Sequence, residues 1–537
     1  MADYVIVGGG SAGCALAARL SEDPEISVVL LEAGPPDRDP FIHMPVGFYK
    51  MTTGKLTWGF HTAPARHANN RRMVYPQARV LGGGSSINAQ VFTRGCPEDY
   101  DAWADAEGCS GWSFNDVLPY FRRSEDNERF SDAFHGTGGP LGVSDLISPH
   151  PLSKVFVRAA QEFGLPYTPD FNGASQAGCG LYQVTVRGGR RCSTVVGYLG
   201  RAKGRPNLRV RTNCSARRVV IEHGRAVGVE CADGSRIPAE REVIVTSGAI
   251  GSPKLLMLSG VGPAEHLREN GIAVLHDLRG VGQNLQDHMD VDIICELNGP
   301  HSYDKYKKPH MKVWAGLQYA LFGAGPVTSN LVEGGAFWWG DRAEKTPDLQ
   351  FHFLPGAGLE EGIAGVPGGN GCTLNSYHVR PRSRGSVRLQ SSDPAAPPIV
   401  DPNAFAEPYD LERAIDGIRI SREIMAQAAF RPFVRREYIP GEKLRTHEEY
   451  AAFARAAGRS AYHPVGTCKM GVDECAVVDP QLRVRGIDGL RIADSSIMPR
   501  LISSNTNAAT IMIAEKAADL IKGNRIAPAA PERQAAA

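Results

Sequence analysis

A glycine-rich turn that directly follows a short apolar run constrains the fold of this chain more than any other feature. The run Tyr4-Val5-Ile6-Val7 predicts a buried strand, and Ala12 to Leu20 has the spacing of a helix. Between them, Gly8, Gly10 and Gly13 complete the pattern G-x-G-x-x-G. These glycines allow a tight turn, the approach of a pyrophosphate, and close packing of the helix on the strand. The pattern predicts a right-handed βαβ unit that binds a dinucleotide.

A second apolar run, Val28-Val29-Leu30-Leu31, predicts the neighbouring parallel strand and ends at Glu32. An acid at this position accepts hydrogen bonds from ribose hydroxyls and repels a 2′-phosphate, which disfavours NADP. The pyrophosphate is expected at the helix N-terminus, at Ser11 and Ala12, where free N–H groups favour an anion. The turn alone does not distinguish FAD from NAD.

Composition excludes several classes of protein. The 59 basic and 58 acidic residues give a net charge of +1, so nothing indicates binding to nucleic acid. No run of about 18 apolar residues occurs, and we expect no transmembrane span. The 11 cysteines are an odd number and form no C-x-x-C pair, which favours a reducing compartment and no zinc site. The expected location is cytoplasmic, with peripheral membrane association left open.

Long motifs further along the chain resemble signatures of the glucose–methanol–choline (GMC) oxidoreductases. The segments are Arg79–Asn88, Ser247–Gly262, Val281–His288, Arg380–Gly385 and Ile492–Pro499. They occur in order, so the resemblance covers nearly the whole chain. Within the family, the chain looks most similar to the choline dehydrogenase and alcohol dehydrogenase branch, which includes enzymes acting on polyethylene glycol.

The resemblance implies FAD as the cofactor, with a second loop of backbone N–H groups around its pyrophosphate and flavin edge. Some members tether FAD through a histidine where this chain has Ile87, so we expect non-covalent binding. Beyond the first turn and Glu32, the expected cofactor contacts are Arg79, Gly82, Gly83, Gly84, Ser85, Asn88, Ala89, Val219, Ser247, Asp494, Asn507 and Thr510.

The expected fold is mixed α/β with two domains. A Rossmann-like FAD-binding domain is assembled from residues 1–150, 190–300 and 455–523. Residues 151–189 and 301–454 form a substrate-binding domain with an antiparallel sheet and helices. Residues 524–537, rich in Ala and Pro, are expected to be a disordered tail.

The resemblance places a catalytic base at His463, within Ala461-Tyr462-His463-Pro464. A histidine suits this role because its pKa lies near working pH. The family's partner position, an Asn or His, maps onto Asn507, 44 residues later, whose amide would hold the substrate oxygen. Asn507 also precedes an expected helix, Ala508 to Lys522, so a helix cap is the alternative role. That helix N-terminus would favour the anionic reduced flavin.

Two further residues are candidates for the substrate pocket. Tyr462 precedes the base and is expected to form a wall. Glu333 lies where related enzymes carry an acid, which pairs with a quaternary ammonium in a choline-type enzyme or serves as a structural carboxylate. A cation–π cage would need clustered aromatic residues, and the sequence does not show whether Trp58, Phe60, Trp338 and Trp339 converge.

These features predict FAD-dependent oxidation of a primary alcohol to an aldehyde. His463 removes the hydroxyl proton, hydride passes to flavin N5, and oxygen, a quinone or another carrier takes the electrons. The alternatives are a lyase that keeps FAD as a structural element, or an electron carrier without a substrate. The particular alcohol (choline, aliphatic, aromatic, furan or polyether) and a homo-oligomeric state are left open.

Overall fold

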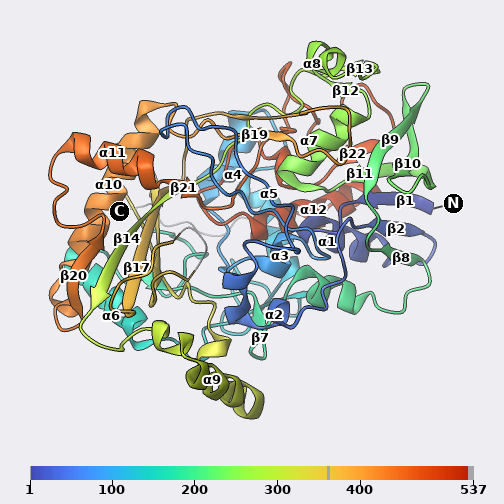
Figure 1. Cartoon of the computed structure of the whole chain (residues 1–537). Coiled ribbons are helices and arrows are strands. Elements are labelled where there is room, and N and C mark those ends of the chain that lie inside the picture. The colour runs from blue at the N-terminus through green and yellow to red at the C-terminus, as the bar shows by residue number, and fades with distance from the viewer. Residues whose placement is uncertain (1, 360–362, 530–537) are drawn as a thin grey trace.

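The computed structural model describes residues 2–359 and 363–529, and two large sheets organise them (Figure 1). The first sheet is mixed: β8, β2, β1, β11 and β22 pair in parallel, and β10 and β9 continue it with antiparallel pairing. Its strands lie in the order β8 (Leu208–Arg211), β2 (Val28–Leu31), β1 (Ala2–Val7), β11 (Arg236–Val245), β10 (Arg225–Cys231) and β9 (Ala216–Glu222), with β22 (Leu490–Ile492) also paired to β11. The prediction of a parallel βαβ unit at the N-terminus is confirmed, because β1 and β2 pair in parallel around helix α1 (Ser11–Leu20).

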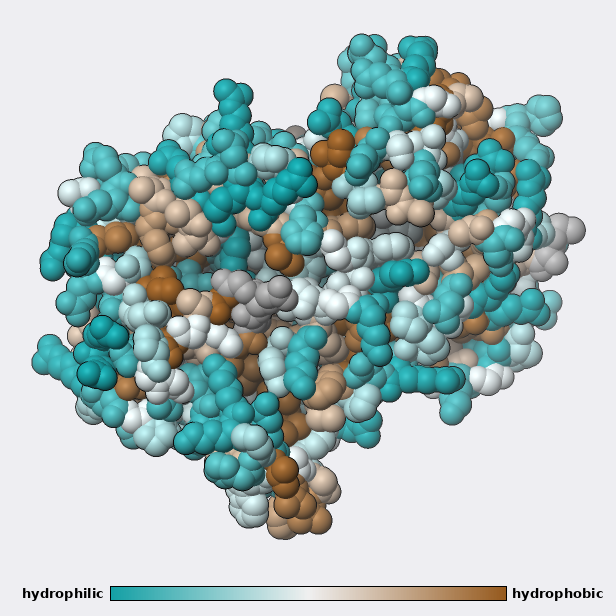
Figure 2. All heavy atoms as spheres, in the orientation of Figure 1, coloured by the Kyte–Doolittle hydropathy of each residue, from teal (hydrophilic) through white to brown (hydrophobic). Residues whose placement is uncertain are grey.

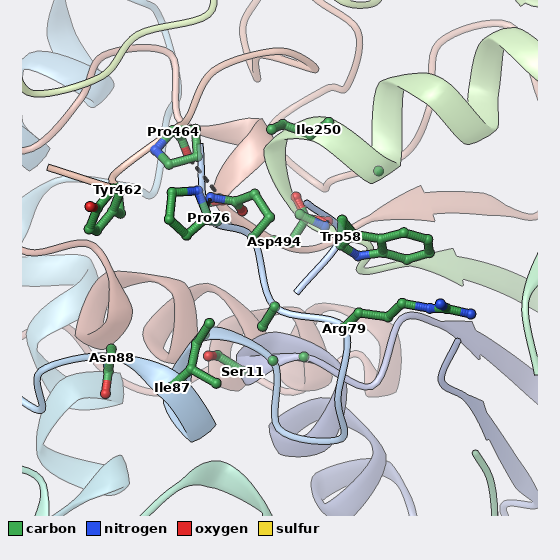
Figure 3. A pocket seen from close by; sticks show the side chains of 18 of the residues that line it. Ser11, Trp58, Pro76, Arg79, Ile87, Asn88, Ile250, Tyr462, Pro464 and Asp494 are labelled. Carbon is green, nitrogen blue, oxygen red and sulfur yellow. Dashed lines mark hydrogen bonds between the residues drawn. The ribbon is translucent and has the colours of Figure 1, made fainter. Parts of the chain in front are cut away.

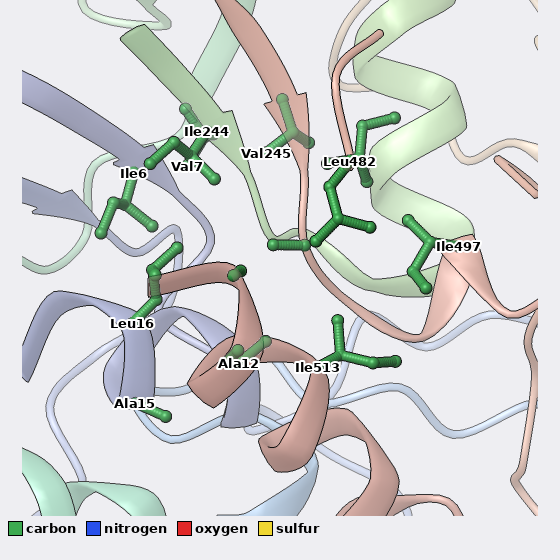
Figure 4. Close-up of a cluster of buried hydrophobic side chains, with 14 of the residues drawn as sticks. Ile6, Val7, Ala12, Ala15, Leu16, Ile244, Val245, Leu482, Ile497 and Ile513 are labelled. Carbon is green, nitrogen blue, oxygen red and sulfur yellow. The ribbon is translucent and has the colours of Figure 1, made fainter. Parts of the chain in front are cut away.

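The core of this first layer lies between the sheet and two helices. Helix α12 (Asn507–Lys522) packs against α1, and Ile6, Leu16 and Ile513 meet in the apolar cluster of Figure 4. Close packing of α1 on β1 depends on Gly13, because a Cβ atom there would lie 1.9 Å from the Gly8 carbonyl oxygen. The third glycine of the motif therefore serves packing rather than ligand contact.

The second sheet is antiparallel. Its order is β20 (Val434–Ile439), β14 (Met289–Leu297), β17 (Gly371–His378), β16 (Leu349–Leu354), β15 (Gly334–Trp338) and β5 (Gly178–Leu181), with β21 (Arg459–Ser460) also paired to β14. Strands β14 and β21 fall in ranges expected to belong to the FAD-binding domain. Two expected boundaries, at 300/301 and 454/455, therefore do not follow the sheets, because these strands carry the chain from one layer into the other.

The other elements surround these layers. The helices are α2 (Pro40–His43), α3 (Gly84–Ile87), α4 (Pro97–Asp105), α5 (Phe114–Ser124), α6 (Pro151–Phe163), α7 (Gly248–Leu258), α8 (Ala264–Glu269), α9 (Pro309–Phe322), α10 (Pro408–Met425) and α11 (His447–Ala457). Short strand pairs are β3 (Glu125–Asn127) with β4 (Leu141–Val143), β6 (Val186–Arg187) with β7 (Arg190–Arg191), β12 (Val261–Gly262) with β13 (His276–Asp277), and β18 (Ser386–Arg388) with β19 (Ile399–Asp401).

The C-terminal segment differs in part from its prediction. Ile526 and Ala529 pack against the first core, and the Ala529 N–H donates to the Asn115 carbonyl at 2.9 Å. The start of the expected disordered tail is thus held on α5. The rest of that prediction, residues 530–537, lies outside the described residues.

Candidate active site

A cavity of about 730 Å³ lies between the two sheets. The first βα turn, α3, the start of α7 and the start of α12 line one end, and β16, β17 and the loop 461–464 line the other. Figure 3 shows Ser11, Arg79 and Asn88 on one side of this space and Tyr462 and Pro464 on another. A cavity of this size between a nucleotide-type turn and a polar pocket can hold a dinucleotide and a small substrate together.

The nucleotide end is built from backbone around Glu32. The carboxylate of Glu32 accepts hydrogen bonds from the N–H groups of Gly9 at 2.9 Å and Gly34 at 2.6 Å, and burial raises its pKa. Both bonds fix the acid at the end of β2, where it lines the cavity. Gly8 has φ +112°, and a Cβ atom there would lie 2.5 Å from the Thr246 carbonyl oxygen. A side chain would therefore disrupt the turn, which fits the glycine requirement of a dinucleotide site.

The second glycine loop lies against the first. Gly83 has φ +52°, and a Cβ atom there would lie 2.6 Å from the Gly10 Cα atom. The Ser85 N–H donates to the Ser11 hydroxyl at 3.2 Å, so the two loops are joined by a hydrogen bond. Two turns rich in backbone N–H groups thus converge on one wall of the cavity, the arrangement expected around a pyrophosphate.

Most of the predicted cofactor residues line the cavity. They are Gly8, Gly10, Ser11, Ala12, Glu32, Arg79, Gly83, Gly84, Asn88, Ala89, Ser247, Asp494, Asn507 and Thr510. Gly13, Gly82 and Ser85 lie behind this wall and shape its turns. Val219 does not line the cavity: its side chain is in the first core and its N–H donates to the Ser259 hydroxyl at 2.8 Å. Ala216, three residues earlier on the same strand, lines it instead.

His463 lies in a tightly held loop at the other end of the cavity. Its backbone N–H donates to Asp287 Oδ1 at 2.9 Å, and the other oxygen of Asp287 accepts from Tyr75 at 2.6 Å and Ser460 at 2.5 Å. Burial raises the pKa of Asp287 to about 6 and lowers the pKa of His463 to about 3. The imidazole of His463 is therefore neutral at ordinary pH, which is the form that accepts a proton.

A chain of hydrogen bonds fixes which nitrogen of His463 carries its hydrogen. His288 Nε2 lies 3.3 Å from the Val379 carbonyl oxygen, which only accepts, so this nitrogen is the donor. Burial lowers the His288 pKa well below its usual value, so the neutral ring has an acceptor at Nδ1. That atom lies 3.0 Å from His463 Nδ1, which must then donate. His463 Nε2 is then the unprotonated nitrogen, and its lone pair accepts a hydrogen bond from the Asn505 amide N–H at 3.1 Å.

The structure pairs His463 with Asn505, whereas the sequence pointed to Asn507 as its partner. Asn507 is the first residue of α12, and its Oδ1 accepts from the Ser11 hydroxyl at 2.8 Å, beside the glycine turns. Asn505, two residues earlier and still in the loop, is the residue that reaches His463. The sequence carried a usable signal, because Asn505 stands in the same Ser503-Ser504-Asn505-Thr506-Asn507 segment and precedes the helix.

Polar residues of the second sheet complete this end, and the sequence analysis missed them. Gln350 and His352 alternate with apolar residues along β16, and they pair across the sheet with Tyr377 and Asn375 of β17. Gln350 Nε2 donates to Asn505 Oδ1 at 3.0 Å, which orients the Asn505 amide nitrogen toward His463. The signal was the polar–apolar alternation within an otherwise apolar strand.

Glu333 has a structural role, one of the two that the sequence allowed. Its carboxylate is buried and accepts from the His150 N–H and the hydroxyls of Ser153, Tyr303 and Ser329, at 2.6 to 2.7 Å. Its side chain does not line the cavity. Among the four aromatic residues considered for a cage, Trp58 and Phe60 line the cavity, whereas Trp338 and Trp339 do not.

Comparison with known proteins agrees with this geometry. The GMC oxidoreductase family models match residues 2–290 and 381–514. An alcohol dehydrogenase [acceptor] from Pseudomonas putida is 44% identical over 97% of this chain and 96% of its own. An oxygen-dependent choline dehydrogenase from Sinorhizobium fredii is 46% identical over 98% of this chain and 96% of its own. The chain belongs to the GMC oxidoreductase family.

Solved structures place the fold in the same group. A pyridoxine 4-oxidase from Mesorbium loti is 31% identical, with a TM-score of 0.89 over 98% of this chain and 100% of its own. A formate oxidase from Aspergillus oryzae is 28% identical, with a TM-score of 0.91 over 97% of this chain and 98% of its own. The predictions of a mixed α/β flavoprotein fold, of FAD as a non-covalent cofactor, and of an oxidoreductase that acts on CH–OH groups are confirmed.

The sequence predicts neither a metal site nor a transmembrane span. Within 2–359 and 363–529, no group of three or more His, Cys, Asp or Glu side chains is arranged to hold a metal ion. In the same part of the chain, no helix combines the length and the apolar character that a membrane span requires.

Proposed function

We propose that this chain oxidises a neutral primary alcohol to an aldehyde, with His463 as the base. The observation that carries the proposal is that the bonds from Val379 through His288 make His463 Nε2 the unprotonated, accepting nitrogen of a residue that lines the cavity. Removing the hydroxyl proton raises the electron density on the alcohol oxygen and makes the carbinol C–H bond easier to break as hydride. When bound, FAD supplies the hydride acceptor.

The residues present fit FAD. Gly8 and Gly83 leave room where a Cβ atom would clash, and Glu32 lines the cavity at the position that receives ribose hydroxyls. Asn507 and Thr510 at the start of α12 also line the cavity. The helix N-terminus adds positive potential at this point.

Asn505 has two roles in the proposal. Without substrate, its Nδ2 donates to His463 Nε2 at 3.1 Å. An alcohol hydroxyl that donates to Nε2 replaces this bond, and the freed amide N–H then donates to the alcohol oxygen. Because Gln350 holds Oδ1 of Asn505, the amide keeps its donor toward the reacting oxygen. His463 moves the proton and Asn505 orients the oxygen.

The charges around the cavity favour a neutral alcohol over choline. Among the described residues, the acids that line it are Glu32, Asp290 and Asp494. Asp290 pairs with Arg459 at 3.1 Å, and Glu32 and Asp494 are bonded to backbone and hydroxyl donors at the nucleotide end. Glu333, the acid that could have bound a quaternary ammonium, does not line the cavity and accepts hydrogen bonds from four donors. Each of these carboxylates already has partners, so none of them is available to pair with a cationic substrate.

The test is anaerobic mixing of the purified holoenzyme with a panel of alcohols while the visible absorption band of the flavin is followed. We expect neutral primary alcohols, aliphatic or aromatic, to bleach this band, and choline to bleach it at least about ten-fold more slowly. Faster bleaching by choline would overturn the preference for neutral substrates. Turnover with an unchanged flavin band would instead support the lyase. Addition of oxygen or of a quinone afterwards would identify the electron acceptor.

A further inference from the structure

Helix α9 (Pro309–Phe322) projects from the body of the protein and exposes large apolar side chains. Figure 1 shows it standing away from the rest of the chain, and Figure 2 shows apolar surface at the same place. Leu321 is 68% exposed and Phe322 75%, and Val313, Trp314 and Leu317 are also exposed. Ala315 is the one residue of this helix that is fully buried. A water-facing helix with this composition is unusual unless its surface has a partner.

The exposed apolar residues form one face. Val313, Trp314, Leu317 and Leu321 recur at the spacing of adjacent helical turns. The opposite side holds the helix to the body, where the Tyr319 hydroxyl donates to the Gly189 carbonyl at 3.2 Å. None of the residues of α9 lines the cavity. The apolar face therefore points away from the site and into the surroundings.

Basic residues precede this helix and occupy its first turn. The segment 301–325 contains Lys305, Lys307, Lys308 and Lys312, against a single acid, Asp304. Asp304 is buried and paired with Lys307 at 2.7 Å, so the exposed charge of the segment is positive. Arg190, on the hairpin against which Tyr319 packs, is also exposed.

The apolar surface continues beyond the helix. Ile147 is exposed, and a Cβ atom on Gly189 would lie 3.4 Å from its Cδ1 atom and 3.3 Å from the Gly323 carbonyl oxygen. Ile147 therefore extends the patch from the C-terminal end of α9. We call Val313, Trp314, Leu317, Leu321, Phe322 and Ile147 the α9 patch.

We propose that the α9 patch and the lysines at the N-terminal end of α9 dock this protein on an anionic lipid surface. Apolar side chains with Trp and Phe suit the boundary between headgroups and acyl chains, and lysines at its edge suit anionic headgroups. The helix has 14 residues, too few to cross a bilayer, so it lies in the interface plane. A second copy of the chain fits less well, because a two-fold interface would bring the two sets of lysines together.

Docking would also orient the catalytic cavity. The short helix η4 (Pro326–Thr328) follows α9 and contacts η1 (Pro45–Lys50). Phe48 of η1 lines the cavity. The α9 patch is thus connected through two short helices to the cavity wall, and a docked molecule holds that wall near the lipid.

The test is sedimentation of the full-length holoenzyme with lipid vesicles. We expect binding to phosphatidylcholine vesicles that contain phosphatidylglycerol, and little binding to phosphatidylcholine alone. Replacing Leu321 and Phe322 by serine, or Lys308 and Lys312 by glutamine, should each weaken binding by about ten-fold or more. Leu275→Ser changes another exposed leucine, beside β13 and far from α9 in Figure 1, and should leave binding unchanged.

Flavin content and alcohol-dependent bleaching should be normal in all these variants, which shows that each is folded. No binding to the anionic vesicles, or equal binding by all variants, would overturn the proposal. Lipid-free dimers that disappear in the Leu321 and Phe322 variant would overturn it too, and would assign the patch to a second copy.

Discussion

The low pKa of His463 determines how the reaction should depend on pH. Burial lowers the pKa of this imidazole to about 3, so its base form is already complete at neutral pH. We therefore expect the rate of flavin bleaching at saturating alcohol to stay constant between about pH 5.5 and pH 8.5. A histidine with an ordinary pKa would instead give a rate that falls as pH drops through about 6.5. Anaerobic rates measured across this range distinguish the two, and an acid limb near pH 6.5 would contradict the account.

His288 is a positioning residue for His463, and its own substitution tests the hydrogen-bond chain. His288→Phe removes the acceptor that holds the hydrogen on His463 Nδ1, and we expect the bleaching rate to fall by about 10- to 100-fold. His288→Gln keeps an acceptor and should recover part of the rate. Flavin content, measured by absorbance, should be unchanged in both variants. Equal rates in the two variants would mean that His288 only fills space.

The partner of His463 and the role of Glu333 could not be predicted from the sequence. The base was predicted at His463 because its flanking motif is distinctive, but the partner was placed on Asn507 rather than Asn505. Two residues at the entrance to a helix point to different ends of the cavity, and only the path of the loop decides which end each one reaches. Glu333 was ambiguous for a similar reason, because a carboxylate's role depends on the four donors that the fold brings to it from distant segments.

Among the elements, the second glycine loop gives a matched pair of substitutions. Gly83→Ala places a Cβ atom 2.6 Å from Gly10 and requires φ +52°, whereas Gly84→Ala meets no atom within 4 Å. We expect Gly83→Ala to cost about 1–3 kcal/mol of folding free energy and to lower flavin content, whereas the folding free energy of Gly84→Ala should be near wild type. The ratio of flavin to protein absorbance and the melting temperature measure both effects. Equal losses in the two variants would contradict the close approach of the loops.

The environment of Glu333 predicts a loss of stability without a change in substrate preference. Glu333→Gln turns one acceptor into a donor that faces hydroxyl and N–H donors, and we expect it to cost about 2–4 kcal/mol. Denaturant unfolding measures the stability, and the anaerobic alcohol panel measures the preference. A changed ratio between choline and neutral alcohols would return Glu333 to the substrate pocket.

Elements with a local pattern were predictable and those built by distant pairing were not. The strand, turn and helix at the N-terminus followed from apolar runs and glycines within about 30 residues, a typical length for a βαβ unit. The second sheet joins strands from residue 178 to residue 460, so its order and the placing of β14 and β21 depend on contacts that no local pattern encodes. The polar residues of β16 and β17 came into the site through that pairing.

At the scale of the whole molecule, FAD should stabilise both layers together, because both line its cavity. We expect removal of the flavin to lower the melting temperature, and re-addition at about 100 times Kd to restore about 2.7 kcal/mol. NAD at the same concentration should have little effect, since the second glycine loop has no role in binding it. Calorimetry on the apoprotein with each nucleotide tests this, and equal stabilisation by NAD would contradict the assignment of the cavity.

The most direct test of the central claim is the single-turnover rate of flavin bleaching by one good alcohol in flavin-matched samples of wild type, His463→Ala, Asn505→Ala and Asn507→Ala. The account predicts a loss of about 10²- to 10⁴-fold for His463→Ala and a smaller loss for Asn505→Ala. Asn507→Ala should weaken flavin retention and leave the rate of the loaded enzyme near that of wild type. A wild-type rate in His463→Ala, or a greater loss for Asn507→Ala than for Asn505→Ala, would contradict the account.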